Sequence, residues 1–297
     1  MRNAPGRPEA GTERQTDWNR KDNFMIQDIA PEHLDNSFHP ARPQPADPLL
    51  CFREGKAMVR YENGRLIFPA ASEMPEGGGI YLFSAAGRSF FLTPEEAPCI
   101  PGYELYSLSE LRGLELASNL DLLVVYTGFH LWTWYGASRF CGSCGTRTVP
   151  ADDERAMVCP ACGKRIYPRI NPAVIVGVIN GDRILITKYR TGFAHHALIA
   201  GFTEIGETAE QTVEREVMEE VGLRVRNIRY YKSQPWGIAS DLLMGFYCEV
   251  DGDTAIHRDE NELGYAEWVQ RDQIILQPSD YSLTNEMMKQ FRDGKIH

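Results

Sequence analysis

Short runs of apolar residues, broken by glycine and proline, dominate the chain from about residue 49 to residue 108 and predict β-strands. These runs cover residues 57–61, 65–68, 80–83 and 89–92. A longer apolar stretch at 122–135 is interrupted by Thr127, Gly128 and His130 and is too short to cross a bilayer. It predicts a buried helix, and residues 25–136 together predict a small mixed N-terminal domain.

Two features of this helix allow a functional interpretation, and packing explains both more simply. His130 is expected to be a core or interface histidine rather than a metal ligand. Trp132, Trp134 and Tyr135 are expected to pack in the core rather than to form a platform for stacked bases. The N-terminal domain therefore predicts no chemistry of its own.

After residue 170 the pattern changes to long runs of β-branched residues. The runs at 173–179 and 183–189 are joined by Asn180 and Gly181, which predict a two-residue hairpin turn. Further strands are expected at 197–200, 225–232, 243–250 and 266–269, with a helix from about residue 282 to residue 291. This order predicts an α/β (α+β) fold in which a mixed sheet packs between helices.

One helix is predicted over residues 209–221 because both of its ends carry capping residues. Thr208, followed three residues later by Gln211, forms the pattern of a capping box. Gly222 can adopt the left-handed conformation that commonly ends a helix.

Acidic side chains gather on one side of this helix. Glu216, Glu219 and Glu220 are spaced i, i+3, i+4, with Arg215 beside them and Glu207 just before the helix. Hard oxygen ligands that converge on one point suit Mg²⁺ or Mn²⁺, and such an ion in turn binds phosphate oxygens. The alternative, a solvated acidic face, does not explain the glycines at both ends of the segment.

Four cysteines form a second candidate metal site. Cys141, Cys144, Cys159 and Cys162 have the spacing C-x2-C-x14-C-x2-C, which is typical of a tetrahedral structural Zn²⁺ site. A pair of disulfides is the alternative. We expect a reduced, cytoplasmic protein instead, because no signal peptide is recognised and the other three cysteines are scattered. Four thiolates leave no open position for water, so this zinc is expected to stabilise the fold rather than to act in catalysis.

Length and charge restrict the remaining possibilities. A chain of 297 residues with 43% hydrophobic content favours about two domains. The net charge of −10 argues against a broad basic surface for nucleic acid and leaves a local basic cleft open. Residues 1–24 are rich in Arg, Glu, Gly and Pro and are expected to form a disordered extension.

The segment 201–223, GFTEIGETAEQTVEREVMEEVGL, resembles the Nudix box at every specified position. The resemblance implies an αβα sandwich with a mixed sheet. It also implies metal-dependent hydrolysis of a nucleoside diphosphate that is linked to a further group, and it leaves that group undefined.

Three other segments indicate which family of Nudix hydrolases the chain resembles. SQPW at 233–236 matches the opening of the SQPWPFPxS signature, YPR at 167–169 precedes PAVI, and the four-cysteine ribbon lies just upstream. Their order resembles the NADH pyrophosphatase family over essentially all of residues 25–297. The resemblance implies a zinc ribbon at 137–166 and a Nudix domain at 167–297. It implies a homodimer that cleaves the pyrophosphate of NADH or NAD⁺ to AMP and nicotinamide mononucleotide.

The resemblance also assigns roles to individual residues. The Mg²⁺ or Mn²⁺ ligands would be the carbonyl of Ala200 and the carboxylates of Glu216, Glu219, Glu220 and Glu262. Catalysis would rest on Glu216, Glu219 and Glu220, and the sequence does not choose the general base between the last two. The substrate-binding residues would be Glu154, Tyr167, Phe202, Gln234, Pro235, Trp236, Gly237, Ile238, Ala239, Ser240, Asp241 and Thr284.

The chain departs from the family after Trp236, where Gly237, Ile238 and Ala239 stand in place of Pro-Phe-Pro. We expect a more mobile and less aromatic wall there, and Trp236 itself is alternatively a core residue. Three other functions stay open: hydrolysis of ADP-ribose or other nucleoside diphosphates, removal of NAD caps from RNA, and a non-catalytic regulator whose ribbon contacts nucleic acid. The intact box argues against the regulator.

Overall fold

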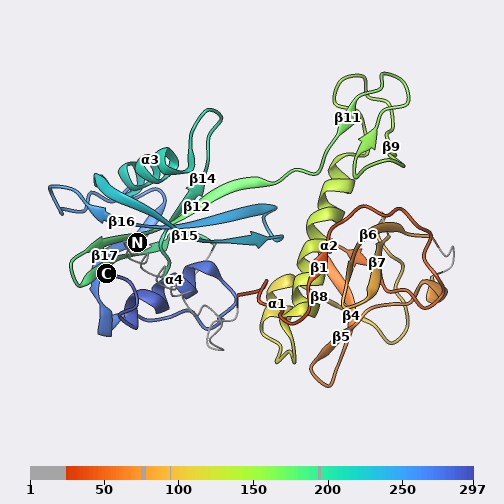
Figure 1. Cartoon of the computed structure of the whole chain (residues 1–297), viewed down its shortest axis with the longest axis horizontal. Helices are drawn as coiled ribbons and strands as arrows, with labels where there is room; N and C mark the ends of the chain where they lie inside the picture. Colours follow the sequence, from red (N-terminus) through yellow and green to blue (C-terminus); the bar gives the residue numbers. More distant parts are fainter. Residues whose placement is uncertain (1–24, 75–77, 94, 193–194) are drawn as a thin grey trace, which may run out of the picture.

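The structure is a computed structural model that describes residues 25–74, 78–93, 95–192 and 195–297. The extension expected at residues 1–24 lies outside the described residues. Figure 1 shows two bodies side by side, an N-terminal one rich in short strands and a C-terminal one with a central sheet. A small lobe stands at the end of the long helix α2 (Asn119–Ala137).

Two small sheets form the N-terminal body. One has the order β1-β6-β7-β2, and the other has the order β3-β4-β5 with β8 paired to β4. The strands are β1 (Leu34–Asp35), β2 (Leu49–Leu50), β3 (Phe52–Arg53), β4 (Lys56–Glu62), β5 (Arg65–Ile67), β6 (Ile80–Ala85), β7 (Arg88–Leu92) and β8 (Glu104–Tyr106). The 3-10 helix η1 (Ala71–Glu73) and the helix α1 (Leu108–Arg112) complete this body. The four strands expected here from the sequence are confirmed by β4 to β7.

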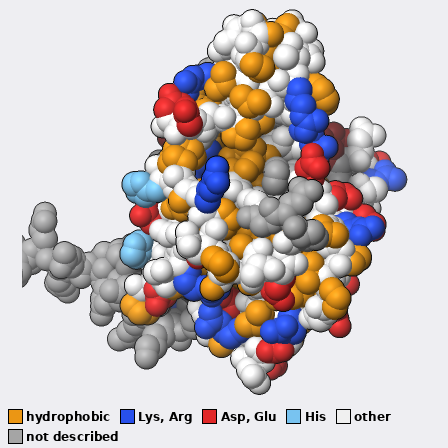
Figure 2. All heavy atoms as spheres, turned by 90° about the vertical axis from the view of Figure 1, so that its right-hand side faces the viewer, with side chains coloured by type: hydrophobic (Ala, Val, Ile, Leu, Met, Phe, Trp, Pro, Cys, Tyr) orange, Lys and Arg blue, Asp and Glu red, His pale blue; other side chains and the backbone are white. Residues whose placement is uncertain are grey.

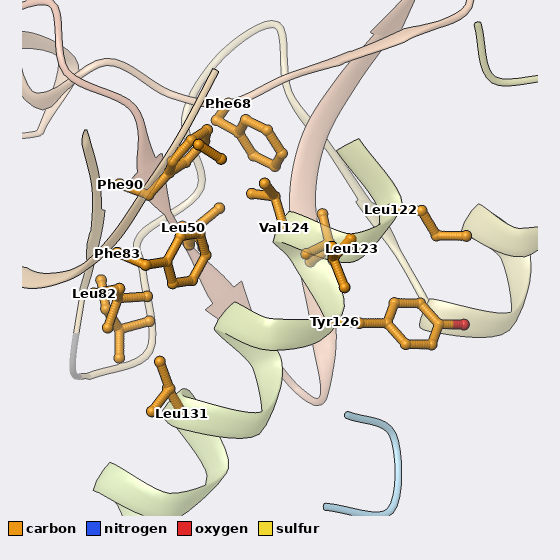
Figure 3. Close-up of a cluster of buried hydrophobic side chains, with 14 of the residues drawn as sticks. Leu50, Phe68, Leu82, Phe83, Phe90, Leu122, Leu123, Val124, Tyr126 and Leu131 are labelled. Carbon is orange, nitrogen blue, oxygen red and sulfur yellow. The ribbon is translucent and has the colours of Figure 1, made fainter. Parts of the chain in front are cut away.

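Helix α2 lies at the centre of the N-terminal hydrophobic core. Leucine and phenylalanine side chains of the sheets, such as Leu50 and Phe83, pack against Val124 and its neighbours on this helix (Figure 3). Burying one such side chain contributes roughly 1.5–3 kcal/mol. The buried helix expected at 122–135 is confirmed, and Trp134 and Tyr135 are buried as expected. No helix in the described ranges combines the length and the apolar character that a membrane span requires.

The small lobe follows α2 directly. It is a three-stranded sheet with the order β11-β10-β9, made of β9 (Val149–Pro150), β10 (Met157–Val158) and β11 (Arg165–Ile166). His130 of α2 is half-buried, and its Nε2 lies 2.7 Å from the carbonyl of Arg169, in the segment that leads from the lobe into the second body. This contact confirms the interface position expected for His130.

The second body is built on one mixed sheet with the order β15-β16-β12-β13-β17, in which β14 also pairs with β12. Its elements are β12 (Asn171–Asn180), β13 (Arg183–Tyr189), β14 (Ile199–Phe202), α3 (Ala209–Val221), β15 (Val225–Trp236), β16 (Asp241–Val250), β17 (Leu263–Gln270), η2 (Arg271–Gln273) and α4 (Leu283–Arg292). The β12–β16 pair is parallel, and the other pairs are antiparallel.

The alternation of side chains along β12 places one helix on each face of this sheet. Val174, Val176 and Val178 share a core with α3, whereas Ile175 and Ile179 share a core with α4. Successive residues of a strand point to opposite faces, so the β-branched residues on either side of Gly177 serve two cores at once. The αβα sandwich expected from the sequence is confirmed.

Several boundaries differ from the sequence prediction, and three of these are the end of β12, the start of β14 and the end of β15. The turn between β12 and β13 consists of Gly181 and Asp182, because Asn180 already pairs with Arg183. Strand β14 begins at Ile199, two residues later than expected. These are shifts of one or two residues in the ends of elements.

The third difference affects the candidate site. Strand β15 continues to Trp236, although the sequence predicted its end at 232, and β16 begins at Asp241. The expected loop of 234–241 is therefore a strand end followed by a turn of four residues. The sequence does not predict this part of the strand, because Gln234 is polar. In the structure Gln234 is fully buried, and its Oε1 accepts the N–H of Leu283 at 2.7 Å. Pro235 is tolerated because β15 is an edge strand.

Candidate active site

Helix α3 directs two glutamates toward the sheet and one toward solvent. Its cap is the expected one, with a capping box at Thr208 and a left-handed Gly222. Glu216 and Glu220 are 9% and 1% exposed, whereas the side chain of Glu219 is 60% exposed. The shared face expected from their spacing therefore holds two buried carboxylates and has Glu219 at its solvent edge.

Arg215 holds three of the acidic side chains in place. Its Nε donates to Glu207 Oε1 at 2.6 Å, and its Nη1 donates to Glu216 Oε1 at 2.7 Å and to Glu219 Oε2 at 2.9 Å. Its Nη2 donates to the carbonyl of Phe202 at 2.8 Å. The bond from Arg215 is the main reason why the pKa of Glu207 falls to about 2. Arg215 thus orients the acidic cluster, as expected from the sequence.

Gly201 is required by the position of Glu216. A Cβ atom at residue 201 would lie 2.0 Å from the carboxyl carbon of Glu216. Gly201 lies in β14, directly after Ala200. Because Gly201 has no side chain, α3 can pack close to this strand and to the carbonyl of Ala200. The first glycine of the box therefore makes room for a carboxylate.

Glu220 is the most perturbed carboxyl group of the cluster. Burial, followed by the nearby Glu216 and Glu262, raises the pKa of Glu220 to about 8. Burial also raises the pKa of Glu216. Within the described residues, Glu220 Oε2 is buried without a hydrogen-bond partner. A buried carboxylate among other carboxylates is unstable unless it is protonated or neutralised by a cation.

This donor set fits a hard divalent cation. The charge of Glu262 raises the pKa of both Glu216 and Glu220, so the three carboxyl groups lie near one another, and the carbonyl of Ala200 belongs to the adjoining strand. Oxygen donors of this kind suit Mg²⁺ or Mn²⁺. Glu220 Oε2, which has no hydrogen-bond partner in the described structure, would be free to bind such a cation.

The four cysteines of the lobe form a compact cluster. Their Sγ atoms all lie within 4.8 Å of one another, with Cys144 3.4 Å from Cys159 and Cys141 3.7 Å from Cys162. Tetrahedral zinc with bonds of about 2.3 Å would separate its sulfur ligands by about 3.8 Å. Gly145 follows the second cysteine with a φ of 73°. In the described part of the chain, this is the one group of at least three ligand side chains that converges so closely.

The lobe also brings two predicted substrate residues together. The hydroxyl of Tyr167 donates to Glu154 Oε1 at 3.0 Å, and Arg165 pairs with Glu154 and Asp153. The Tyr167 side chain is largely exposed. Figure 1 shows the lobe at the end of α2, apart from α3. Within one chain, this pair does not lie beside the acidic cluster.

The end of β15 is held by protein contacts on several sides. Gln234 donates to the carbonyl of Tyr281 at 2.8 Å and to Gln27 Oε1 at 3.2 Å. The ring of Trp236 packs against Tyr126 at 5.7 Å between centroids, and the guanidinium of Arg112 lies 5.2 Å from the Trp236 ring. Trp236 therefore takes the packing position considered above as its alternative.

The turn after Trp236 has a buried start and an exposed middle. Gly237 is buried, whereas Ile238 and Ala239 are exposed. Ser240 has a φ of 62°, and the next residue, Asp241, is buried with Oδ1 unpartnered among the described residues. Burial raises the pKa of Asp241 to about 6.

Three predicted residues lie at other places around the sheet. Thr284 is half-buried in the first turn of α4, next to the residue that bonds Gln234. Phe202 is 53% exposed at the end of β14. Glu262 precedes β17, and its carbonyl accepts the N–H of Arg190 at 2.9 Å.

Tyr189 lies near the acidic cluster, although no motif in the sequence marked it as a site residue. The hydroxyl of Tyr189 donates to the carbonyl of Ala200 at 3.3 Å. Burial, followed by the charges of Glu220 and Glu216, raises the pKa of Tyr189. It ends strand β13, and an aromatic residue at a strand end is too common to mark a site.

Comparisons with known proteins define the class. Residues 169–291 match the family model described as the NUDIX domain, so the chain contains a Nudix domain. Residues 137–167 match the model described as the NADH pyrophosphatase zinc ribbon domain. The chain therefore contains a Nudix domain that follows directly on a zinc ribbon of the NADH pyrophosphatase type.

Individual proteins are similar to parts of this chain. The chain is 40% identical over 166 residues to "NAD-capped RNA hydrolase NudC" of Escherichia coli O9:H4 (strain HS), which is 54% of this chain and 63% of that protein. The protein of the same name from Escherichia fergusonii gives the same values. The match thus spans less than two thirds of these relatives. A NUDIX hydrolase structure from Nitrosomonas europaea has a TM-score of 0.47 and 21% identity, covering 53% of this chain and 92% of that chain.

Proposed function

We propose that this protein is a hydrolase that uses a divalent cation to cleave the pyrophosphate bond of NADH or NAD⁺, giving AMP and nicotinamide mononucleotide. The observation that carries the proposal is the buried, unpartnered carboxyl of Glu220 beside Glu216 and Glu262, on a complete Nudix box. The zinc ribbon of the NADH pyrophosphatase type supports NAD(H) as the substrate.

Mg²⁺ or Mn²⁺ would be held by the carboxylates of Glu216, Glu219, Glu220 and Glu262 and by the carbonyl of Ala200. When bound, the cation supplies positive charge to the pyrophosphate oxygens and makes a water molecule more acidic. Glu219 is exposed and has room to accept a proton from that water, whereas Glu220 is buried against the strand. Arg215 keeps Glu216 and Glu219 oriented, and its remaining hydrogen bonds go to Glu207 and to the carbonyl of Phe202.

Substrate recognition would come from two parts of the molecule. Tyr167 and Glu154 form one pair in the ribbon, and Phe202 with the turn 237–241 lies on the Nudix domain. Because the ribbon is apart from α3 in one chain, we propose that a homodimer completes the site, with the ribbon of one chain beside the acidic cluster of the other. A dinucleotide has two rings to bind, and two aromatic side chains could hold them by stacking.

A second candidate function is the removal of NAD caps from RNA. It is the same bond cleavage on a longer substrate, and the name of the relatives that are 40% identical favours it. ADP-ribose hydrolysis is a third candidate, supported by the loss of the family's Pro-Phe-Pro after Trp236. A cytoplasmic location belongs to the same proposal, because all seven cysteines are free in the structure. We also propose that the chain is divided into an extension (1–24), an N-terminal domain (25–136), the zinc ribbon (137–166) and the Nudix domain (167–297).

A substrate panel tests these functions. Purified full-length protein with Mg²⁺ or Mn²⁺ is given NADH, NAD⁺, ADP-ribose or NAD-capped RNA, and kcat/KM is compared. We expect one of the two nicotinamide dinucleotides or the capped RNA to be the preferred substrate, with AMP or a 5′-monophosphate RNA end as product. Preference for ADP-ribose would contradict the NAD(H) assignment.

Two substitutions on the same helix provide the control. Glu220→Gln removes a buried charge in the acidic cluster and should lower kcat by at least about a hundredfold. Glu214→Gln makes the same chemical change at an exposed position of α3 and should leave kcat unchanged. Equal activity of the two variants would contradict a catalytic role for the cluster.

A further inference from the structure

Helix α2 of the N-terminal domain is linked to the turn 237–240 in two ways, one direct and one through the start of β12. The first is direct, because Gly237 lies against the backbone of Tyr126. A Cβ atom at residue 237 would lie 2.1 Å from the Tyr126 carbonyl oxygen and 2.7 Å from its carbonyl carbon. The φ of Gly237 is not in the left-handed region, so the close approach alone explains the glycine. No side chain larger than hydrogen fits while α2 is in this position.

The second contact runs through the start of β12. The Nε2 atom of His130 lies 2.7 Å from the carbonyl of Arg169, and Arg169 Nε donates to Asn171 Oδ1 at 2.8 Å. Asn171 then bonds the turn twice: its Nδ2 donates to the carbonyl of Ala239 at 3.3 Å, and its backbone N–H donates to the carbonyl of Ser240 at 2.8 Å. Tyr126 and His130 are four residues apart, so one face of α2 serves both contacts.

Further contacts fix the strand that leads into the turn. Trp236 is covered by the ring of Tyr126 on one side and by the guanidinium of Arg112 on another. Gln27 Nε2 donates to the carbonyl of Ser233 at 2.9 Å, which fixes the strand just before the turn. Between these anchors, Ile238 and Ala239 remain exposed.

We propose that Arg112, Tyr126 and His130 of the N-terminal domain are positioning residues, which set the shape of the turn 237–241 and through it the affinity for the dinucleotide. The inference rests on the proposed function and adds a role for the N-terminal domain. It also accounts for Gly237 where the family has proline: in this chain the helix backbone occupies the space that a ring would need. The turn is shaped by the helix behind it instead of by its own prolines.

Gly237→Ala tests the direct contact. The methyl group forces the turn away from α2, while the acidic cluster on α3 is unchanged. We expect KM for the preferred dinucleotide to rise at least about tenfold and kcat to stay within about threefold, because binding geometry is lost and chemistry is retained. Gly136→Ala is the matched control, since a Cβ atom at that position of α2 meets nothing within 4 Å, and it should leave KM unchanged.

Arg112→Met tests the same role without a steric clash, in case Gly237→Ala does not fold. The methionine keeps an apolar stem near Trp236 and removes the guanidinium; Arg112→Lys restores the cation. We expect KM to rise about threefold to tenfold in the methionine variant and to recover partly in the lysine variant. An unchanged KM in a folded Arg112→Met variant, or a fall in kcat at constant KM, would overturn the proposal.

Hydrogen–deuterium exchange of the full-length protein gives a readout that is independent of activity. Amides of residues 237–241 should exchange faster in Gly237→Ala and Arg112→Met than in the wild type and Gly136→Ala. Faster exchange with unchanged KM would mean that the contact only stabilises the fold, which contradicts the proposal. A wild type that hydrolyses no dinucleotide would contradict the proposed function and leave the exchange result to be judged separately.

Discussion

Glu220 shows how one side chain can oppose folding and serve function. Its carboxyl is almost fully buried, lies near Glu216 and Glu262, and keeps one oxygen without a partner in the described structure. Such a group raises its pKa, here to about 8, because the ionised form has lost its water. A cation that neutralised the cluster would remove this cost, so a bound divalent ion should also stabilise the folded chain.

The first prediction concerns the pH dependence of stability without divalent cations. Below the ordinary glutamate pKa of 4.5, Glu220 is neutral in the folded and unfolded chains and has no effect. Between 4.5 and about 8 the unfolded chain releases a proton that the folded chain keeps, so stability falls as pH rises. Above that window, Glu220→Gln should therefore melt at a higher temperature than the wild type in EDTA.

Differential scanning calorimetry at pH 5 and pH 9 checks this. The difference in Tm between Glu220→Gln and the wild type should be larger at pH 9, and saturating Mg²⁺ or Mn²⁺ should reduce it by stabilising the wild type. A variant that is less stable than the wild type at both pH values, in EDTA, would contradict the strained carboxylate.

At the scale of single elements, the caps of α3 and the shortness of the ribbon strands decide how the two candidate metal sites are built. Helix α3 starts at a capping box and stops at a left-handed glycine, which places its carboxylates at a fixed height over β14. The ribbon has strands of only two residues each, too short to fold by pairing alone, and a zinc ion bound by its four thiolates would hold it together.

The second prediction is that the ribbon binds one zinc per chain and that this zinc is structural. Cys141→Ser should remove most of the zinc and lower Tm, because a closed thiolate site contributes to folding. Metal analysis of protein purified without chelator, together with thermal melting, measures both effects. A stable variant that lost only its catalytic activity would make the zinc catalytic instead.

At the scale of the whole molecule, the arrangement of the parts decides which groups can meet. Helix α2 carries the ribbon at its end (Figure 1), and its residue Tyr126 lies against Gly237 in the turn after β15. Figure 2 shows the side of the molecule that faces right in Figure 1, where positive and negative side chains are interspersed rather than gathered into one basic surface. On this face, the described residues form no broad basic patch.

The third prediction tests the shared site. A heterodimer of one chain carrying Glu220→Gln and one carrying Glu154→Gln with Tyr167→Ala keeps one complete site if the site is formed between chains. It should have about half the activity of the wild type, although each parent homodimer is nearly inactive. Differently tagged chains, coexpressed and purified through both tags, provide the sample. A heterodimer as inactive as its parents would place each site within one chain.

The sequence by itself determined the local features. The bounds of α3, its caps, the cysteine spacing and the strands flanking Asn180 follow from side-chain patterns within about twenty residues, where backbone periodicity and turn chemistry act directly. The resemblance of the box and the ribbon to known families was equally local, and the matches over 137–167 and 169–291 confirm it.

Tertiary structure decided what depends on partners far along the chain. The extension of β15 needs Gln27 and Leu283, Trp236 finds its neighbours at Arg112 and Tyr126, and Gly237 is explained by a helix more than a hundred residues earlier. The raised pKa of Glu220 likewise depends on burial and on a residue beyond β16. Such properties come from desolvation and close packing between distant segments, which no local pattern encodes.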